Sequence, residues 1–219
     1  MLKVLELFAG SRSFSSVAES YGFKTYTTDF QSFDKIDQVC NIFDFDVDRV
    51  PYIPDFIWAS PPCQTFSVAS IGTHWTGGHR AYIPKTKEAE TGKQIVEKTV
   101  AIINHFKSKN PNLKWIIENP RGVLRKLNLI DREPKTAWYC QYGDSRAKPT
   151  DLWFNFEWEP KRCKNNRNPE QITIFEPCKH QLAPRGSKTG TQGLSNDFER
   201  SKVPAELCKD VIRAVINEE

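Results

Sequence analysis

Residues 2–29 read LKVLELFAGSRSFSSVAESYGFKTYTTD and contain the pattern that decides the fold. The mostly apolar stretch LKVLELF predicts a buried strand, which ends in a tight turn at Gly10. A segment with helical spacing follows, and FKTYTTD predicts a second strand that ends on Asp29. A strand, a helix and a strand in direct succession indicate two parallel strands joined by a crossover helix.

The helix of this unit is expected at residues 11–22. Ser11 or Ser13 can cap its amino end, because a serine oxygen accepts a backbone N–H that the first turn leaves without a partner. Gly22 stops the helix, since glycine readily adopts the left-handed conformation found after a last helical turn.

Further strands and helices follow in the same alternation. DFIWAS at 55–60 and LKWIIENP at 113–120 predict strands, and the segment 91–110 between them predicts an amphipathic helix. One face of that helix carries Ile95, Val96, Thr99, Ile102, Ile103 and Phe106. This alternation predicts an α/β fold with a mostly parallel sheet, whose functional groups gather at the carboxyl ends of the strands.

The pattern changes in the second half of the chain. TAWYCQYG at 136–143 and TDLWFNFEW at 150–158 predict two aromatic-rich strands, which we expect to pair antiparallel. The closing segment 203–219 predicts a helix with Pro204 near its first turn. We expect a catalytic core at 1–154, a short basic segment at 155–199, and a helix at 200–219 that completes the core.

Composition limits the class of protein. The 219 residues include 38% hydrophobic and 26% charged residues, which suits one globular domain. No apolar run is long enough to span a membrane, and the amino end lacks signal-peptide features. We therefore expect a cytoplasmic protein that has no membrane partner and whose six cysteines are mostly reduced.

The net charge of +4 is unevenly distributed. Between Pro160 and Gly190 seven Lys and Arg residues stand against Glu170 and Glu176, which leaves +5 in this stretch. A charged stretch is commonly a solvated surface, but one that holds all of the net charge favours contact with phosphates.

Side chains that could bind a ligand or react lie at the ends of four predicted strands. The first strand is followed by Phe8, Ala9 and Gly10, and the second ends on Asp29, a layout typical of a nucleoside cofactor site. A thiol, Cys63, follows a later strand, and Glu118 closes the next one. Alone, Cys63 could be a small buried residue and Glu118 a helix cap, but a thiol and a carboxylate at neighbouring strand ends favour catalysis.

These segments together resemble the DNA cytosine carbon-5 methyltransferases. ELFAG is similar to the first cofactor motif of that family, SPPCQTFS to its catalytic loop, and IIENP to its Glu-Asn motif. YCQYGDSRAKP stands where the arginine-bearing motif belongs, and RSKVPAEL resembles the closing motif. The matches run in family order from about residue 4 to 212 and cover nearly the whole chain.

The resemblance implies a Rossmann-like, S-adenosylmethionine-dependent methyltransferase fold with a small, irregular, basic target-recognition segment. It also implies methyl transfer to carbon-5 of a cytosine flipped out of double-stranded DNA, through a covalent bond to Cys63. Glu118 would stabilise the protonated base, and Asn119 would orient the base or brace the loop. We expect a monomer acting in a bacterial cell or a phage-infected host, in a restriction-modification setting.

The same resemblance implies two sets of binding residues. The cofactor set is Phe8, Ala9, Gly10, Ser11, Asp29, Asn41 (with Asp44 as an alternative to it), Ile42, Ser60, Pro62 and Ser201. The set that would contact DNA is Gln64, Arg146, Lys148, Arg185 and Lys188.

The chain departs from the family pattern at several positions. Arg12 and Ser13 replace two glycines, and Arg12 either pairs with the cofactor carboxylate or points to solvent. Asn41 stands where the family usually has aspartate, and Ser201 replaces the closing asparagine. Two rival functions remain open: methylation of cytosine in RNA, and nucleic-acid binding without catalysis.

Two further features have competing interpretations. Cys163, Cys178 and His180, with Cys140 as a fourth ligand, could hold zinc, but no CxxC pair is present and we expect no metal. THWTGGHRAY at 73–82 contains glycines suited to a hinge, so it either closes over the extruded base or is a plain surface loop.

Overall fold

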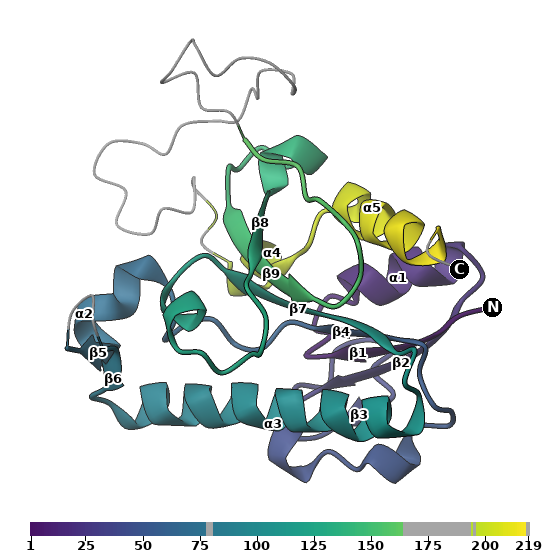
Figure 1. The fold of residues 1–219 in the computed structure, drawn as a ribbon, viewed down its shortest axis with the longest axis horizontal. Helices are drawn as coiled ribbons and strands as arrows, with labels where there is room; N and C mark the ends of the chain where they lie inside the picture. Colours follow the sequence, from purple (N-terminus) through teal and green to yellow (C-terminus); the bar gives the residue numbers. More distant parts are fainter. Residues whose placement is uncertain (78–80, 164–193, 195, 218–219) are drawn as a thin grey trace.

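A computed structural model describes residues 1–77, 81–163, 194 and 196–217 of the chain. Its centre is a seven-stranded sheet (Figure 1). The strands of this sheet are β1 (Lys3–Leu7), β2 (Lys24–Asp29), β3 (Gln38–Val39), β4 (Phe56–Ala59), β7 (Lys114–Pro120), β8 (Lys135–Trp138) and β9 (Pro149–Phe154).

The strand order is β3-β2-β1-β4-β7-β9-β8. Neighbouring strands from β3 to β7 pair in parallel, whereas β9 pairs antiparallel with both β7 and β8. The chain leaves β1 toward β2 on one side and later returns to β4 on the other, which is the switch point of a Rossmann-like sheet. The predicted α/β class and the predicted antiparallel pair are therefore confirmed.

Helices cover both faces of the sheet. The long helix α3 (Lys87–Lys109) lies along one face, and α1 (Ser13–Ser20) and α5 (Ala205–Ile216) lie on the other (Figure 1). Successive strand residues point to opposite faces, so β1 sends Leu5 and Leu7 to the core under α3 and Val4 to the core under α1 and α5.

The apolar faces predicted for α3 and α5 are buried as expected. In α3 the side chains of Val96, Thr99, Ile102, Ile103 and Phe106 are buried. In α5 the side chains of Leu207, Cys208, Val211, Ile212 and Val215 are buried. The helix α3 begins four residues before the predicted start, because Thr86 caps it by accepting the N–H of Ala89 at 3.2 Å.

The predicted cap of α1 is wrong. Arg12, not a serine, precedes the helix, and no side chain at that position caps it. Instead the buried carboxylate of Glu6 in β1 accepts the N–H groups of Phe14 at 3.3 Å and Ser15 at 2.8 Å. A carboxylate at a helix amino end is favourable because the unpaired N–H groups carry partial positive charge.

Two segments differ from the expected strands and loops. The segment expected as a strand at 136–143 is a strand only to Trp138 and continues as a 3₁₀ turn over Tyr139–Tyr142. The segment after Cys63 folds into α2 (Ile71–His74) and a hairpin of β5 (Trp75–Thr76) and β6 (Ile83–Pro84). A short helix, α4 (Asp197–Ser201), precedes α5.

None of the helices within the described ranges has the length and apolar character needed to cross a membrane.

Candidate active site

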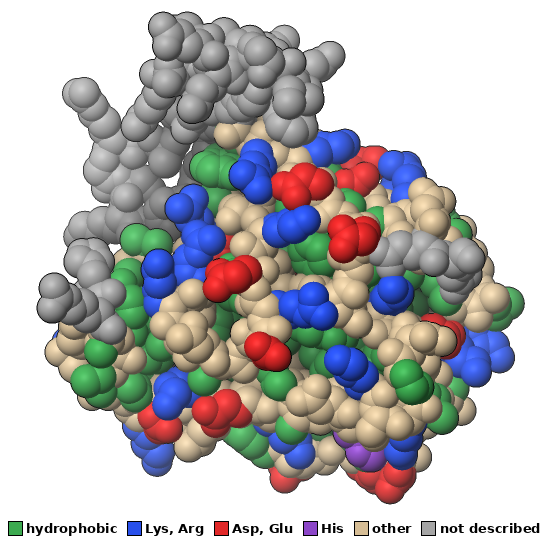
Figure 2. All heavy atoms as spheres, in the orientation of Figure 1, with side chains coloured by type: hydrophobic (Ala, Val, Ile, Leu, Met, Phe, Trp, Pro, Cys, Tyr) green, Lys and Arg blue, Asp and Glu red, His purple; other side chains and the backbone are tan. Residues whose placement is uncertain are grey.

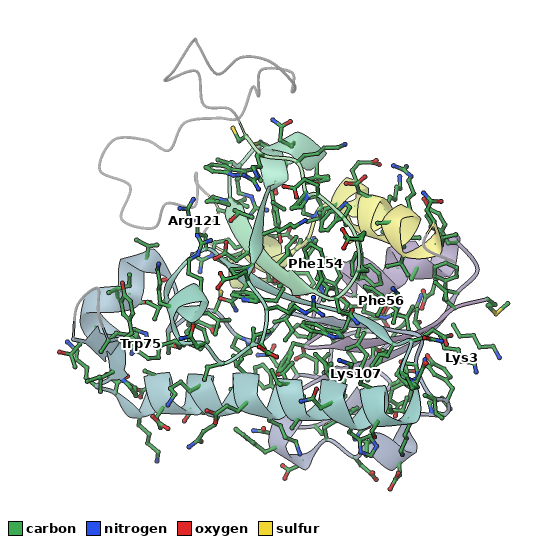
Figure 3. The ribbon with its side chains drawn as sticks, in the orientation of Figure 1. Lys3, Phe56, Trp75, Lys107, Arg121 and Phe154 are labelled. Carbon is green, nitrogen blue, oxygen red and sulfur yellow. The ribbon has the colours of Figure 1, made fainter. Side chains whose placement is uncertain are left out.

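The sheet brings the four predicted strand ends to one edge. Across the sheet, β2 ends at Asp29 and the neighbouring β1 leads into Phe8. Next to β1, β4 leads into the loop with Cys63, and β7 contains Glu118 near its end. Figure 3 shows Arg121, just after β7, and Trp75, in the hairpin, at the end of the molecule opposite Lys3, where β1 begins. A thiol in the loop after β4 and a carboxylate in the neighbouring strand β7 therefore lie at the same edge of the sheet as the predicted cofactor residues.

A cavity of about 210 Å³ opens at the ends of β1 and β2. Its walls are formed by Phe8, Thr28, Asp29, Phe30, Cys40, Asn41, Ile42, Pro62 and Ile95. Most of these side chains are apolar or aromatic, and Asp29 is the acid among them. Such a lining suits a flat nucleoside with hydroxyl groups at one side.

The backbone around Asp29 fixes the orientation of its carboxylate. One oxygen accepts the N–H of Gly10 at 3.0 Å and the other accepts the N–H of Gln31 at 3.0 Å. Burial raises the pKa of this carboxyl, and the backbone N–H groups oppose that rise. Phe8 and Gly10 both have left-handed backbone conformations, with φ of 59° and 47°, which are unusual for a phenylalanine and common at functional sites.

The loop that carries Cys63 is held by backbone contacts on both sides. The Cys63 carbonyl accepts the N–H groups of Phe66 at 3.0 Å and Ser67 at 3.2 Å. The Phe66 carbonyl accepts the N–H of Val123 at 2.8 Å, and Trp75 Nε1 donates to the Thr65 carbonyl at 2.7 Å. The loop that carries Cys63 is thus fixed to the segment after β7 and to the hairpin.

Two glycines allow this loop to pack closely. A Cβ at Gly122 would lie 2.0 Å from the Phe66 carbonyl oxygen, and a Cβ at Gly92 would lie 2.7 Å from Thr65 Oγ1. Asn119 adds a third brace, because its side-chain amide donates to the Pro61 carbonyl at 2.9 Å. The structure therefore gives Asn119 a contact with the loop that precedes Cys63.

Charged groups surround the thiol of Cys63. Burial raises the pKa of this thiol, and the negative charge of Glu118 raises it further, whereas Lys148 and Arg200 lower it. Burial also lowers the pKa of Lys148, whose Nζ donates to the Arg200 carbonyl at 2.9 Å. Lys148 is thus the cation placed to favour the thiolate in this site.

Comparison with known proteins points to one family. The chain is 27% identical over 217 residues to a "Probable DNA (cytosine-5)-methyltransferase" of Frog virus 3 (isolate Goorha), a match that covers 96% of this chain and 99% of the viral protein. The similarity to this viral protein extends over nearly the whole length of both chains. No protein-family profile matches the sequence.

Solved structures of that family show a weaker likeness. The S. pombe Dnmt2 methyltransferase is matched with a TM-score of 0.49 and 12% identity, over 72% of this chain and 52% of that one. A mutant of Spodoptera frugiperda DNMT2 is matched with a TM-score of 0.45 and 16% identity, over 75% and 54%. This chain spans about half the length of these structures.

The structure brings together only part of the cofactor set inferred from the methyltransferase resemblance. Phe8, Asp29, Asn41, Ile42 and Pro62 line the cavity, whereas Ala9, Gly10, Ser11, Ser60 and Ser201 are not among its walls.

Three polar members of that set bond elsewhere. The Ser60 hydroxyl accepts from Trp58 Nε1 at 2.9 Å, and Ser11 shares a hydrogen bond with Ser13 at 2.7 Å. The exposed Ser201 hydroxyl donates to the Phe198 carbonyl within α4, at 2.8 Å.

Two arginines that were expected at the cofactor or DNA are held by acids instead. Arg12 forms an ion pair with Glu19, so it neither points to solvent nor faces the cavity. Arg146 donates from Nε to both Asp144 oxygens, at 2.9 and 3.1 Å, and its side chain is buried. Arg146 therefore acts within the protein in this structure, while Lys148 remains beside Cys63.

Several predicted residues lie outside the described part of the chain: Arg185, Lys188, Cys178, His180 and His79. Within the described ranges, no cluster of three or more His, Cys, Asp or Glu side chains could hold a metal ion. The side chain of Gln64 is exposed beside Cys63, where it lines a second cavity between this loop and the start of α3. On the face seen in Figure 2, basic side chains are interspersed with acidic ones.

Sequence reasoning missed several residues of the site. Thr28, Phe30, Cys40 and Ile95 line the cavity, and Phe30 stands out because 63% of this aromatic residue is exposed. The sequence did hold one signal for Phe30, because this residue directly follows Asp29, the acid that ends β2. Tyr139 was also missed, because nothing in the sequence indicates that it contacts Glu118.

Proposed function

We propose that this protein transfers a methyl group from S-adenosylmethionine to carbon-5 of cytosine in double-stranded DNA, through a covalent bond to Cys63. The observation that carries the proposal is the placement of Cys63, in the loop after β4, and Glu118, in the adjacent strand β7, next to a cavity lined by Asp29 and Pro62. The 27% identity to the viral protein supports the same reaction class.

The cavity fits the nucleoside part of the cofactor. Phe8, Phe30 and Ile42 offer apolar contact to a flat base, and the Asp29 carboxylate can accept hydrogen bonds from ribose hydroxyls. Asn41 can contact the polar edge of adenine. When bound, S-adenosylmethionine supplies a methyl group on a positively charged sulfur, which a nucleophilic carbon can take.

The residues around Cys63 would make the base nucleophilic. The Cys63 thiolate adds to carbon-6 of cytosine, and electrons move toward carbon-5. Glu118 stabilises the proton on the ring nitrogen and the neighbouring amine, which lowers the cost of that addition. Once carbon-5 has taken the methyl group, its proton passes to solvent water, and the electrons of that C–H bond restore the double bond as the thiolate leaves carbon-6.

Lys148 partly opposes the effects that hinder ionisation of Cys63, whose pKa stays above its usual value. Burial and Glu118 both raise the pKa of the thiol, so a thiolate forms readily only with a cation nearby. A cytosine must also leave the duplex to reach Cys63, because its ring carbons are inaccessible in a stacked helix. We propose that the protein does this as a monomer in the cytoplasm.

The test is a trapping experiment. An oligonucleotide duplex with 5-fluorocytosine at the target should form an adduct that survives denaturation, in the presence of S-adenosylmethionine, because fluorine does not leave as a proton. Cys63→Ser should form none. Trapping on a matched RNA in place of DNA would transfer the function to RNA, and no trapping on either would leave the proposed reaction without support and overturn it.

A further inference from the structure

Tyr139 contacts Glu118 of the proposed active site but is not one of the predicted site residues. It begins the 3₁₀ turn that follows β8, and its side chain is fully buried. Because β9 lies between β8 and β7, the turn after β8 reaches across β9 toward Glu118 in β7.

The Tyr139 hydroxyl donates a hydrogen bond to Glu118 Oε1 at 3.0 Å. The Glu118 side chain is itself buried, at 5% exposure, so water does not compete freely for this oxygen. Hydrogen bonds to an ionised, buried carboxylate are among the stronger ones in proteins. The contact therefore constrains the orientation of Glu118.

The phenol can act only as a donor toward this carboxylate. Burial raises the pKa of Tyr139 well above its usual value, and the negative charge of Glu118 raises it further. The ring is also fixed in place, because the Lys148 ammonium lies 4.5 Å from its centroid. Tyr139 thus contacts two of the charged groups that act on Cys63, Glu118 and Lys148.

We propose that Tyr139 is a positioning residue that holds Glu118 by one oxygen, so that the other oxygen faces the target base. This inference rests on the function proposed above. The Tyr139 hydroxyl touches neither the nucleophile nor the base in this arrangement, and its contribution passes through Glu118. Removing the hydroxyl lets the carboxylate rotate away from the orientation that supports attack by Cys63.

The chain offers a matched control in the same turn. Tyr142 is also buried, its hydroxyl donates to a carboxylate oxygen of Asp210 at 3.3 Å, and Lys161 lies 5.3 Å from its ring centroid. Asp210 belongs to α5, and neither Asp210 nor Tyr142 lines the cavity. Tyr142→Phe therefore removes the same kind of hydrogen bond outside the site.

The experiment compares single-turnover and steady-state methylation of a DNA duplex by five chains: wild type, Tyr139→Phe, Glu118→Gln, the double variant and the control Tyr142→Phe. Tyr139→Phe should slow the reaction about tenfold, the range for losing one hydrogen bond to a charged group, and leave the KM for DNA nearly unchanged. In the Glu118→Gln background the same change should cost less than about twofold, since a residue acting only through Glu118 has nothing further to lose.

The outcomes separate the two proposals. If wild type methylates DNA and Tyr139→Phe costs the same factor in both backgrounds, Tyr139 does not act through Glu118 and the inference is wrong. If Tyr142→Phe slows methylation as much as Tyr139→Phe, the effect is structural and the inference is equally wrong. A wild-type chain without methylation or trapping instead defeats the proposed function.

Discussion

The carboxylate of Glu6 predicts how the stability of the protein depends on pH. This side chain is 3% exposed and accepts the first N–H groups of α1. Burial raises its pKa from 4.5 to about 7, although the hydrogen bonds from α1 oppose the rise. Replacement by glutamine keeps the shape and one acceptor oxygen and removes the titration.

The sign and size of the effect follow from that pKa. The folded chain binds the Glu6 proton more tightly than the unfolded chain, so the group contributes most stability below about pH 4.5 and loses it as pH rises through about 7. At about 1.4 kcal/mol for each tenfold change in proton affinity, the loss between pH 5 and 8 is roughly 2 to 3 kcal/mol. Glu6→Gln lacks this loss.

The assay is urea unfolding followed by circular dichroism, for wild type and Glu6→Gln at several values between pH 5 and 8. The free energy of unfolding of the variant, relative to wild type, should rise by roughly 2 to 3 kcal/mol across this range. Glu97→Gln, an exposed position on α3, should follow wild type. A difference between Glu6→Gln and wild type that stays constant from pH 5 to 8 would refute the reasoning.

Three other predictions concern the site and the basic segment. Glu118→Gln should lower turnover, measured as methylation rate, by about two to four powers of ten and leave cofactor affinity, measured by calorimetry, nearly unchanged. Turnover within a fewfold of wild type would mean that the role of Glu118 is structural. Gly122→Ala should destabilise the chain by about 1 to 3 kcal/mol and slow trapping at Cys63, because the added Cβ meets the Phe66 carbonyl. The control Gly72→Ala places its Cβ in open space and should match wild type in thermal unfolding. Arg185→Ala with Lys188→Ala should weaken binding to all DNA sequences alike and flatten its salt dependence, in titrations across salt concentrations; binding as tight as wild type at moderate salt would contradict a phosphate role.

The regular part of the fold was predictable because periodic burial leaves a direct record in the sequence. The apolar runs of β1, β4 and β7 and the apolar face of α3 occur where the pattern indicates them. The placement of Asp29 and the Cys63 loop at one edge of the sheet was predictable because parallel strands bring their carboxyl ends together.

The contacts that were missed join residues of different elements, or of different turns, that only the folded chain brings together. The cap of α1 comes from Glu6 in the preceding strand, so a search for serine or threonine beside the helix could not find it. Tyr139 reaches Glu118 only because β9 inserts between β7 and β8. The ion pair between Arg12 and Glu19 likewise depends on the folded chain and is not described by local sequence patterns.

The packing of α1 against α5 has a consequence for how the chain folds during synthesis. The two helices share one core, and the N–H of Val203, just before α5, donates to Ser13 Oγ at 3.1 Å across 190 residues. A ribosome therefore releases α1 long before the partner that covers its apolar side exists. Contacts of such long sequence separation form slowly, so the nascent chain should expose this apolar surface until α5 emerges, and it would then depend on chaperones to stay soluble.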